Sequence, residues 1–313
     1  MISIRYRLTE FMFRHFVKPM MKNAATEPEK FFEKQLKRQQ SVLPLKKLHR
    51  KYNFEEREAN GTVYYAISPE GSLANGVVLY FFGGGYFMPG NAGDFEFAQE
   101  MANETNADVW LVWYPLFPKA SALEIVEAGV NVYREALRAF KPTDITFFGL
   151  SSGASLAQNI CIHIVDKNLN LPMPDKLILH SPAFRIPPTE KQKERMAQLD
   201  KLDCVVPVDY ISENKAMDIV NFTGAEYMKS NVDFSWKGLP DIYVIFGSHE
   251  VLLAELDEAK QKAASENVVM RTYIGEGMMH TWAAAGFLPE SRHVRSKIYS
   301  IIRQDSELKW ENA

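Results

Sequence analysis

One stretch of the chain decides its fold: Thr146-Phe147-Phe148-Gly149-Leu150-Ser151-Ser152-Gly153-Ala154-Ser155-Leu156-Ala157. An apolar run ends in the pattern Gly-x-Ser-x-Gly, and apolar residues at helical spacing, Leu156, Ile160 and Ile164, follow directly. A strand, a sharp turn and a helix in this order expose a serine at a helix N-terminus. Free N–H groups and the helix dipole favour developing negative charge there. The stretch therefore predicts that Ser151 is a catalytic nucleophile; the alternative is a glycine-lined turn with an idle serine.

Strand and helix signals alternate on both sides of this stretch. Residues 52–67 predict a hairpin, because two strand-like segments flank the turn residues Asn60-Gly61. Further strands are expected at 77–82, 109–113, 145–150, 176–180, 242–246 and 268–273, and further helices at 94–105, 121–140, 252–264 and 292–303. Such alternation predicts an α/β fold with a mostly parallel central sheet, of about eight strands, and helices on both of its faces. Ligands gather at the carboxyl ends of the strands in sheets of this kind.

Two segments interrupt this alternation and are candidates for a helical cap over the carboxyl edge of the sheet. We expect residues 1–45 to form N-terminal cap helices and residues 184–236 to form a cap insertion. The catalytic core then consists of residues 46–183 and 237–313, so that one core is built from two parts of the chain.

The composition is that of an ordinary globular protein, with 46% hydrophobic and 24% charged residues. A net charge of -3 provides no broad basic field, so we expect no nucleic-acid partner. The two cysteines, Cys161 and Cys204, match neither a disulfide framework nor the spacing of metal ligands. Nothing in the sequence points to an oxidising compartment, and a cytoplasmic location is expected.

The first 22 residues are both basic and apolar. Charged residues interrupt them too often for a secretory signal or a membrane span. Leu8, Met12, Phe16 and Met20 fall four residues apart, which predicts an amphipathic helix. We expect this apolar line to cover a patch of its own protein; contact with a membrane surface is the less favoured alternative.

A reactive serine needs a base, and the base needs a third group to hold it. His280 is the favoured base because it lies in a glycine-rich loop after the last strand, at the expected active edge; His180 and His249 are less favoured. Glu250 follows the next-to-last strand and is the favoured acid, with Asp257 as the alternative. The chain order of serine, acid and histidine is the one found in hydrolases built around such a turn.

A glycine triplet, residues 83–85, follows the first buried strand. Backbone N–H groups can approach a substrate where no side chain intervenes. We therefore expect the N–H groups of Gly84, Gly85 and Ser152 to form an oxyanion hole. A phosphate-binding loop would continue into Lys-Ser or Lys-Thr, which this sequence lacks.

Together these motifs resemble the hormone-sensitive-lipase-like branch of the α/β-hydrolase carboxylesterases. The resemblance covers the chain from Tyr64 to the C-terminus and rests on five segments: Phe82-Gly83-Gly84-Gly85-Tyr86, Tyr114-Pro115-Leu116-Phe117-Pro118-Lys119, Gly149-Leu150-Ser151-Ser152-Gly153, Gly247-Ser248-His249-Glu250-Val251-Leu252 and Gly277-Met278-Met279-His280. It implies the α/β-hydrolase fold and a cap built from the N-terminal helices plus an insertion after the sixth strand. Two positions depart from the family pattern: Phe82 stands where a loop-anchoring histidine is usual, and Glu250 where an aspartate is usual.

The resemblance implies a serine esterase that hydrolyses short- to medium-chain acyl esters through an acyl-serine, with no metal and no organic cofactor. Tyr86, Phe87 and Phe184 are the expected walls of the substrate pocket. Two rivals stay open: cleavage of an amide, a thioester or a sugar acetate by the same residues, and a binding protein on a retired hydrolase scaffold. A homodimer through the last helix and strand is also left open.

Overall fold

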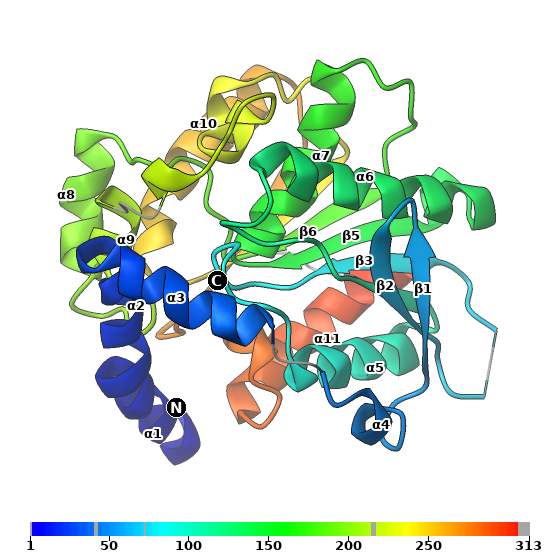
Figure 1. Ribbon diagram of the computed structural model, residues 1–313, viewed down its shortest axis with the longest axis horizontal. Coiled ribbons are helices and arrows are strands. Elements are labelled where there is room, and N and C mark those ends of the chain that lie inside the picture. The colour runs from blue at the N-terminus through cyan, green and yellow to red at the C-terminus, as the bar shows by residue number, and fades with distance from the viewer. Residues whose placement is uncertain (1, 41–42, 72, 214–216, 306–313) are drawn as a thin grey trace.

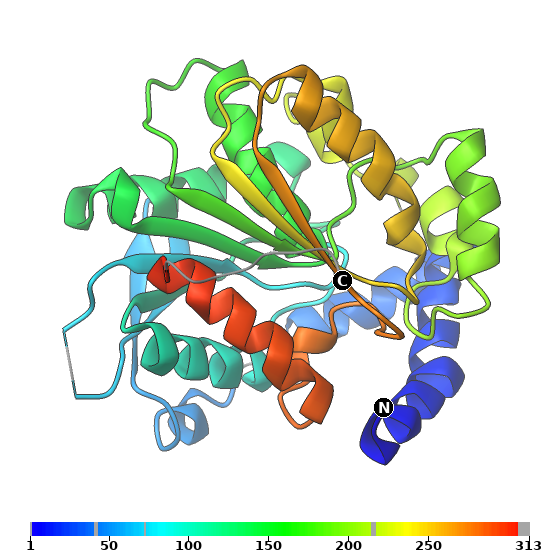
Figure 2. The same cartoon turned by 180° about the vertical axis from the view of Figure 1, so that it is seen from behind.

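The computed structural model describes residues 2–40, 43–71, 73–213 and 217–305 (Figures 1 and 2). Its centre is an eight-stranded sheet in the order β1-β2-β4-β3-β5-β6-β7-β8. The pairs β1–β2 and β2–β4 are antiparallel, and the other five pairs are parallel. The strands are β1 (Phe54–Ala59), β2 (Thr62–Ile67), β3 (Val77–Phe81), β4 (Asp108–Val112), β5 (Ile145–Leu150), β6 (Lys176–His180), β7 (Asp241–Gly247) and β8 (Met270–Gly275). This topology, with helices on both faces, confirms the predicted fold class.

The helices fall into a group that covers the sheet and a group that lies beside it or in its connections. The covering helices are α5 (Ala92–Thr105), α6 (Ala122–Ala139), α7 (Ser152–Asp166), α10 (Leu256–Ser265) and α11 (Pro289–Arg303). The other α-helices are α1 (Ile4–Met12), α2 (Lys18–Thr26), α3 (Pro28–Gln39), α4 (Leu45–Leu48), α8 (Glu190–Leu199) and α9 (Val208–Ser212). A π-helical segment η1 (Phe13–Val17) joins α1 to α2, and the short 3-10 helices are η2 (Pro142–Asp144), η3 (Met217–Ile219), η4 (Glu226–Met228), η5 (Asn231–Asp233), η6 (Val251–Glu255) and η7 (Trp282–Ala284).

Both faces of the sheet are covered: α5 and α11 lie on one face, and α6 and α7 lie on the other (Figures 1 and 2). The strands β3, β5 and β6 are buried along their whole length. β3 reads in the sequence as an unbroken apolar run and β5 as a nearly unbroken one, as strands covered on both faces do, whereas β6 has an apolar centre between Lys176 and His180. In the hairpin, Asn60 and Gly61 adopt φ values of 47° and 82°, the positive values that a tight two-residue turn between twisted strands requires.

The N-terminal helices and the insertion between β6 and β7 lie together at one side of the sheet (Figure 1). Two ion pairs join them: the Nζ atoms of Lys18 and Lys22 lie 3.0 Å from carboxylate oxygens of Asp200 and Asp209, respectively. These contacts bring together the two segments that interrupt the alternation of strands and helices, although they lie far apart in the sequence.

The outer face of α1 and η1 corrects part of one prediction. Of the four residues expected to pack on the protein, Leu8, Met12 and Phe16 are 61%, 52% and 72% exposed. The fourth, Met20, is partly buried against the core, as predicted. The inner face is formed instead by Tyr6 and Thr9, which are buried. Apolar residues lie on both sides of this helix, so spacing alone could not tell which side faces the core; the buried tyrosine, whose hydroxyl finds backbone partners, decides it.

Candidate active site

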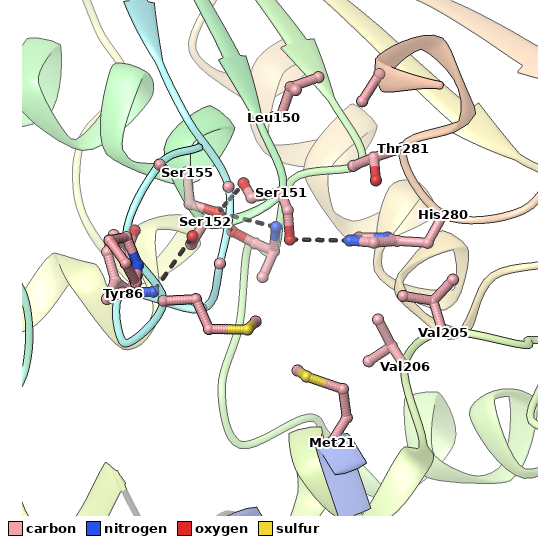
Figure 3. A pocket seen from close by; sticks show the side chains of 18 of the residues that line it. Met21, Tyr86, Leu150, Ser151, Ser152, Ser155, Val205, Val206, His280 and Thr281 are labelled. Atoms are coloured by element: carbon pink, nitrogen blue, oxygen red, sulfur yellow. Dashed lines mark hydrogen bonds between the residues drawn. The ribbon is translucent and has the colours of Figure 1, made fainter. Parts of the chain in front are cut away.

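Three predicted residues from three different loops meet at the carboxyl edge of the sheet. Ser151 follows β5, Glu250 follows β7, and His280 follows β8. The Ser151 Oγ lies 2.8 Å from His280 Nε2 (Figure 3). On the other side of the ring, His280 Nδ1 lies 2.6 Å from Glu250 Oε2. The histidine and the glutamate are buried, and the serine is half-buried. The arrangement can remove a proton from the serine hydroxyl and stabilise the imidazolium that forms.

The turn that presents Ser151 is strained and tightly packed. Ser151 adopts φ 52° and ψ -123°, outside the regions that serine prefers. A Cβ added at Gly149 would lie 2.3 Å from the Gly153 carbonyl oxygen, and one at Gly153 would lie 2.1 Å from that of Phe81. Both flanking positions therefore require glycine, as the motif predicts. Strain of this kind persists only where the surrounding structure enforces it.

A chain of hydrogen bonds holds Oε1 of Glu250, the carboxylate oxygen that does not contact His280. Glu250 Oε1 accepts hydrogen bonds from the Gly247 N–H and from the Ser181 hydroxyl, at 2.9 Å for the hydroxyl. His180 Nε2 accepts from the Ala283 N–H at 3.3 Å, which leaves Nδ1–H to donate to the Ser181 Oγ at 3.0 Å. Burial holds the pKa of His180 well below its usual range, so this histidine stays neutral. It supports the acid rather than acting on Ser151.

Asp203, from the insertion, ties the cap to the loop that carries the acid. Its buried carboxylate accepts hydrogen bonds from the N–H groups of Val205 at 2.7 Å, Val206 at 2.8 Å and Val251 at 2.9 Å. Burial raises the pKa of Asp203 to about 6, against the lowering effect of His280 and of the three N–H donors. The contact with Val251, the residue after the acid, fixes the end of that loop.

Glu255 holds the other end of the insertion, where the chain leaves β6. Its Oε2 accepts hydrogen bonds from the N–H groups of Phe184 at 2.5 Å and Arg185 at 3.0 Å. Its Oε1 is buried and has no partner among the described residues. Burial raises the pKa of Glu255 to about 8, so the carboxyl is protonated at neutral pH.

The predicted oxyanion hole lies beside the serine. Gly84, Gly85 and Ser152 line the same cavity as Ser151. The two glycines adopt positive φ values of 132° and 63°, which only glycine tolerates readily. Among the described residues, nothing accepts a hydrogen bond from the N–H groups of Gly84 and Gly85. Ser152 is the first residue of α7, so its N–H has no partner within the helix.

The glycine loop is anchored through Phe82, where the family usually has a histidine. The Phe82 ring stacks on Tyr114, with ring centroids 4.3 Å apart and an interplanar angle of 10°, and it also contacts Trp113. The Tyr114 hydroxyl donates a hydrogen bond of 2.6 Å to the Phe82 carbonyl oxygen. Aromatic stacking and one buried hydrogen bond thus hold this loop.

The cavity above Ser151 has a volume of about 740 Å³. Apolar side chains form much of its lining, and the N-terminal segment contributes Phe13, Val17, Met20 and Met21. Figure 3 shows Met21 on the side of the cavity opposite the serine.

Of the three predicted pocket walls, only Tyr86 lines this cavity. Phe87 is fully buried against Phe31, Phe32 and Phe117. The prediction for Phe87 is therefore wrong, because its ring joins the aromatic core under the glycine loop.

The prediction for Phe184 is corrected in the same way. Its ring packs against Trp236 and Phe246, behind the cavity wall. The preceding residue, Ala183, lines the cavity in its place.

Sequence reasoning missed Ser181 and Asp203, and it found the segment of Tyr114 without the role of Tyr114 as an anchor. Ser181 directly follows β6 and Tyr114 lies two residues after β4, at the edge where ligands gather, and that position could have marked them. Asp203 has no local signal, because its contact with Val251 joins residues 48 apart. The alternative acid, Asp257, is exposed and pairs with Arg195 at 2.9 Å.

Two further properties bear on the chemistry. Among the described residues, no three His, Cys, Asp or Glu side chains are grouped so that they could hold a metal ion. In the same part of the chain, every helix is too short or too polar to cross a membrane.

Comparison with known proteins agrees with this geometry. Residues 78–284 match the model of a family described as alpha/beta hydrolase fold. The chain is 25% identical over 228 residues to an esterase of Acinetobacter venetianus, an alignment that covers 72% of this chain and 74% of the relative. A solved esterase/lipase from an uncultured bacterium is 26% identical with a TM-score of 0.70, covering 88% of this chain and 97% of that one. An esterase of the bacterial hormone-sensitive lipase family shares the fold at 21% identity, with a TM-score of 0.73 and coverage of 93% and 97%.

Proposed function

Because this chain belongs to the α/β-hydrolase fold family and is a carboxylic ester hydrolase, we propose that it belongs to the hormone-sensitive-lipase-like branch and cleaves short- to medium-chain acyl esters through an acyl-serine intermediate. One observation carries the proposal: a continuous set of hydrogen bonds runs from the Ser151 hydroxyl through His280 to the buried Glu250. A protein that only binds a ligand does not need this set, so the set favours catalysis over the binding-protein reading.

The proposed reaction begins when Ser151 Oγ attacks the ester carbonyl carbon and His280 Nε2 takes the hydroxyl proton. The N–H groups of Gly84, Gly85 and Ser152 stabilise the oxyanion, at about 3 kcal/mol for each donor. When the carbonyl re-forms, the bond to the alkoxy oxygen breaks and His280 protonates the leaving alcohol. A water molecule then attacks the acyl-serine with the same base, which releases the carboxylic acid and restores Ser151.

Glu250 keeps the imidazole in the tautomer that this sequence of steps requires. Its Oε2 accepts the Nδ1–H of His280, which leaves Nε2 free to accept the serine proton. The second oxygen, Oε1, is held by Ser181 and Gly247, so the carboxylate cannot rotate away from the histidine without losing two hydrogen bonds. Glutamate therefore fills the place where the family usually has aspartate.

The proposed substrate class rests on the lining of the cavity. Met20, Met21, Val206 and Leu252 are among the apolar side chains that line its wall, and they suit an acyl chain. An apolar wall favours an acyl group over a charged or strongly polar one, because polar groups lose hydration there without replacement.

The test is hydrolysis of p-nitrophenyl acetate, butyrate, octanoate and palmitate by the wild-type protein and by Ser151→Ala. We expect activity on the shorter esters, with kcat lower in the variant by on the order of 10⁴-fold or more. Ser265→Ala, at an exposed serine far along the chain, is the matched control and is expected to hydrolyse the esters as the wild type does. Equal rates in the wild-type and Ser151→Ala proteins would refute the mechanism and favour the binding-protein reading.

A further inference from the structure

The outer face of the first helical segment carries an unusual concentration of exposed apolar side chains. Large apolar residues exposed among the described residues number nine, and five of them fall between residues 4 and 16. These five define the N-terminal apolar surface: Ile4, Leu8, Phe11, Met12 and Phe16. Ile4 and Phe16 are 76% and 72% exposed, as much as many charged residues. Surfaces of this kind on a folded protein mark an interaction site.

The helix that bears this surface is fixed to the core, so the exposure does not come from a detached end. The Tyr6 hydroxyl donates to the Gly277 carbonyl oxygen at 3.0 Å and accepts from the Met279 N–H at 2.5 Å. The Ser3 N–H and hydroxyl donate to the Glu290 carboxylate at 2.6 and 3.0 Å. The inner face of the helix is thereby committed to the protein, and the outer face is left for a partner.

The charge around this surface indicates the partner. The first 22 residues contain five lysines and arginines and one glutamate. Three of these cations, Arg14, Lys18 and Lys22, are already paired with carboxylates. Arg5 and Arg7 are exposed and form no ion pair with any described residue. An apolar stripe bordered by cationic side chains is the pattern of a helix that lies in the interface of a membrane with anionic lipids. A second copy of the chain fits less well, because a two-fold contact through this face would set the two basic borders against each other.

The position of the segment relative to the cavity fits the same partner. Phe13, Val17 and Met20, which lie in the same helical segment or just after it, line the cavity that contains Ser151 and His280. One side of this segment therefore faces the lining of the site, and another side bears the apolar surface. Where the proposed function holds, a docked protein would meet those acyl esters that are apolar enough to partition into the bilayer.

From these observations we propose that the N-terminal apolar surface, with Arg5 and Arg7, docks the protein on an anionic lipid membrane. The docking is peripheral: the apolar side chains enter the boundary between headgroups and acyl chains, and the basic side chains contact the anionic headgroups. The proposal concerns where the enzyme works, and it does not depend on the chemistry at Ser151.

The test is flotation of the full-length protein with vesicles of phosphatidylcholine alone and of phosphatidylcholine mixed with phosphatidylserine. We expect binding to the mixed vesicles, a decrease of that binding with added NaCl, and little binding to phosphatidylcholine alone. Phe11→Gln/Phe16→Gln is expected to weaken binding by at least about 10-fold. Arg5→Gln/Arg7→Gln is expected to weaken it by about 10- to 30-fold.

The matched control is Leu73→Gln/Val269→Gln, which removes two exposed apolar side chains outside the N-terminal segment and is expected to bind vesicles as the wild type does. Circular dichroism and thermal unfolding confirm that each variant is folded, so the result stands even if no ester is hydrolysed. Absence of binding to the mixed vesicles, or equal binding by Phe11→Gln/Phe16→Gln and the wild type, would overturn the proposal. A dimer in solution that Phe11→Gln/Phe16→Gln dissociates would assign the surface to a second copy and would overturn it as well.

Discussion

Replacement of Glu255 by glutamine tests how a buried carboxyl ties the cap insertion to the core. Glu255 Oε2 accepts the N–H groups of Phe184 and Arg185, the residues at which the insertion begins. Glutamine keeps an acceptor oxygen for these two donors but cannot ionise. It therefore resembles the protonated carboxyl that the folded protein holds at neutral pH.

The size of the effect follows from the pKa of Glu255, which burial raises to about 8 in the folded protein. The unfolded chain has the ordinary value of about 4.3. Because the folded state binds the proton more tightly, the stabilising contribution is fully present below about pH 4 and is lost as the pH rises through about 8. At about 1.4 kcal/mol per pH unit, the free energy of unfolding falls by about 3.5 kcal/mol between about pH 5 and about pH 8. For a chain of this length that corresponds to about 5 °C in Tm.

The assay is thermal unfolding of both proteins over this pH range, followed by tryptophan fluorescence. We expect the Tm of the wild type to fall by about 5 °C relative to that of Glu255→Gln, while other titrating groups affect both proteins alike. Glu194→Gln, an exposed change in the same insertion, controls for the loss of one negative charge. A difference in Tm between wild type and Glu255→Gln that does not change with pH would refute the reasoning.

Two further predictions concern contacts that position the site. Ser181→Ala removes the hydroxyl that holds Glu250, and we expect kcat for p-nitrophenyl butyrate to fall by about 10-fold, equivalent to about 1.4 kcal/mol, with KM nearly unchanged; an unchanged kcat would contradict this role. Tyr114→Phe leaves the Phe82 carbonyl without its donor, and we expect a loss of about 1 to 2 kcal/mol in stability together with a lower kcat. Denaturant titration and steady-state kinetics measure the two effects, and a Tyr114→Phe protein with the stability and kcat of the wild type would show that ring stacking alone holds the loop.

The sheet could be predicted from the sequence because its signals are local. β3 is an unbroken apolar run and β5 is nearly so, which marks both as buried strands. Asn60-Gly61 marks a tight turn, because both residues readily adopt positive φ values. Ser151, Glu250 and His280 were found for a related reason: each follows a strand of one parallel sheet, so the topology brings them to one edge.

What could not be predicted depends on contacts between distant segments. Phe87 and Phe184 follow motifs at the site, yet their rings turn into the core, because space there is set by residues such as Phe31 and Trp236 from the two cap segments. The orientation of α1 was mistaken because its apolar residues occupy more than one side, and the hydroxyl of Tyr6 settled which side is buried. Ser181 was not predicted because a serine after a strand is common. Its role depends on the hydrogen bond that its hydroxyl donates to Glu250, a residue 69 positions further along the chain.

The bond between Tyr6 and the histidine loop has a consequence for how the protein is made. Its partners Gly277 and Met279 lie 271 and 273 residues further along the chain. At about 5 to 20 residues per second, a ribosome needs on the order of 15 to 60 s to reach them. Bringing Tyr6 and Gly277 together in an otherwise unfolded chain carries a length-dependent entropic cost of about 5 kcal/mol in free energy. Throughout that interval Tyr6 on α1 has no hydrogen-bond partners, and the core against which it packs is incomplete. We therefore expect the catalytic centre to be completed last in biosynthesis. Until then, we expect the newly synthesised α1 to depend on chaperones or on early contact with a membrane.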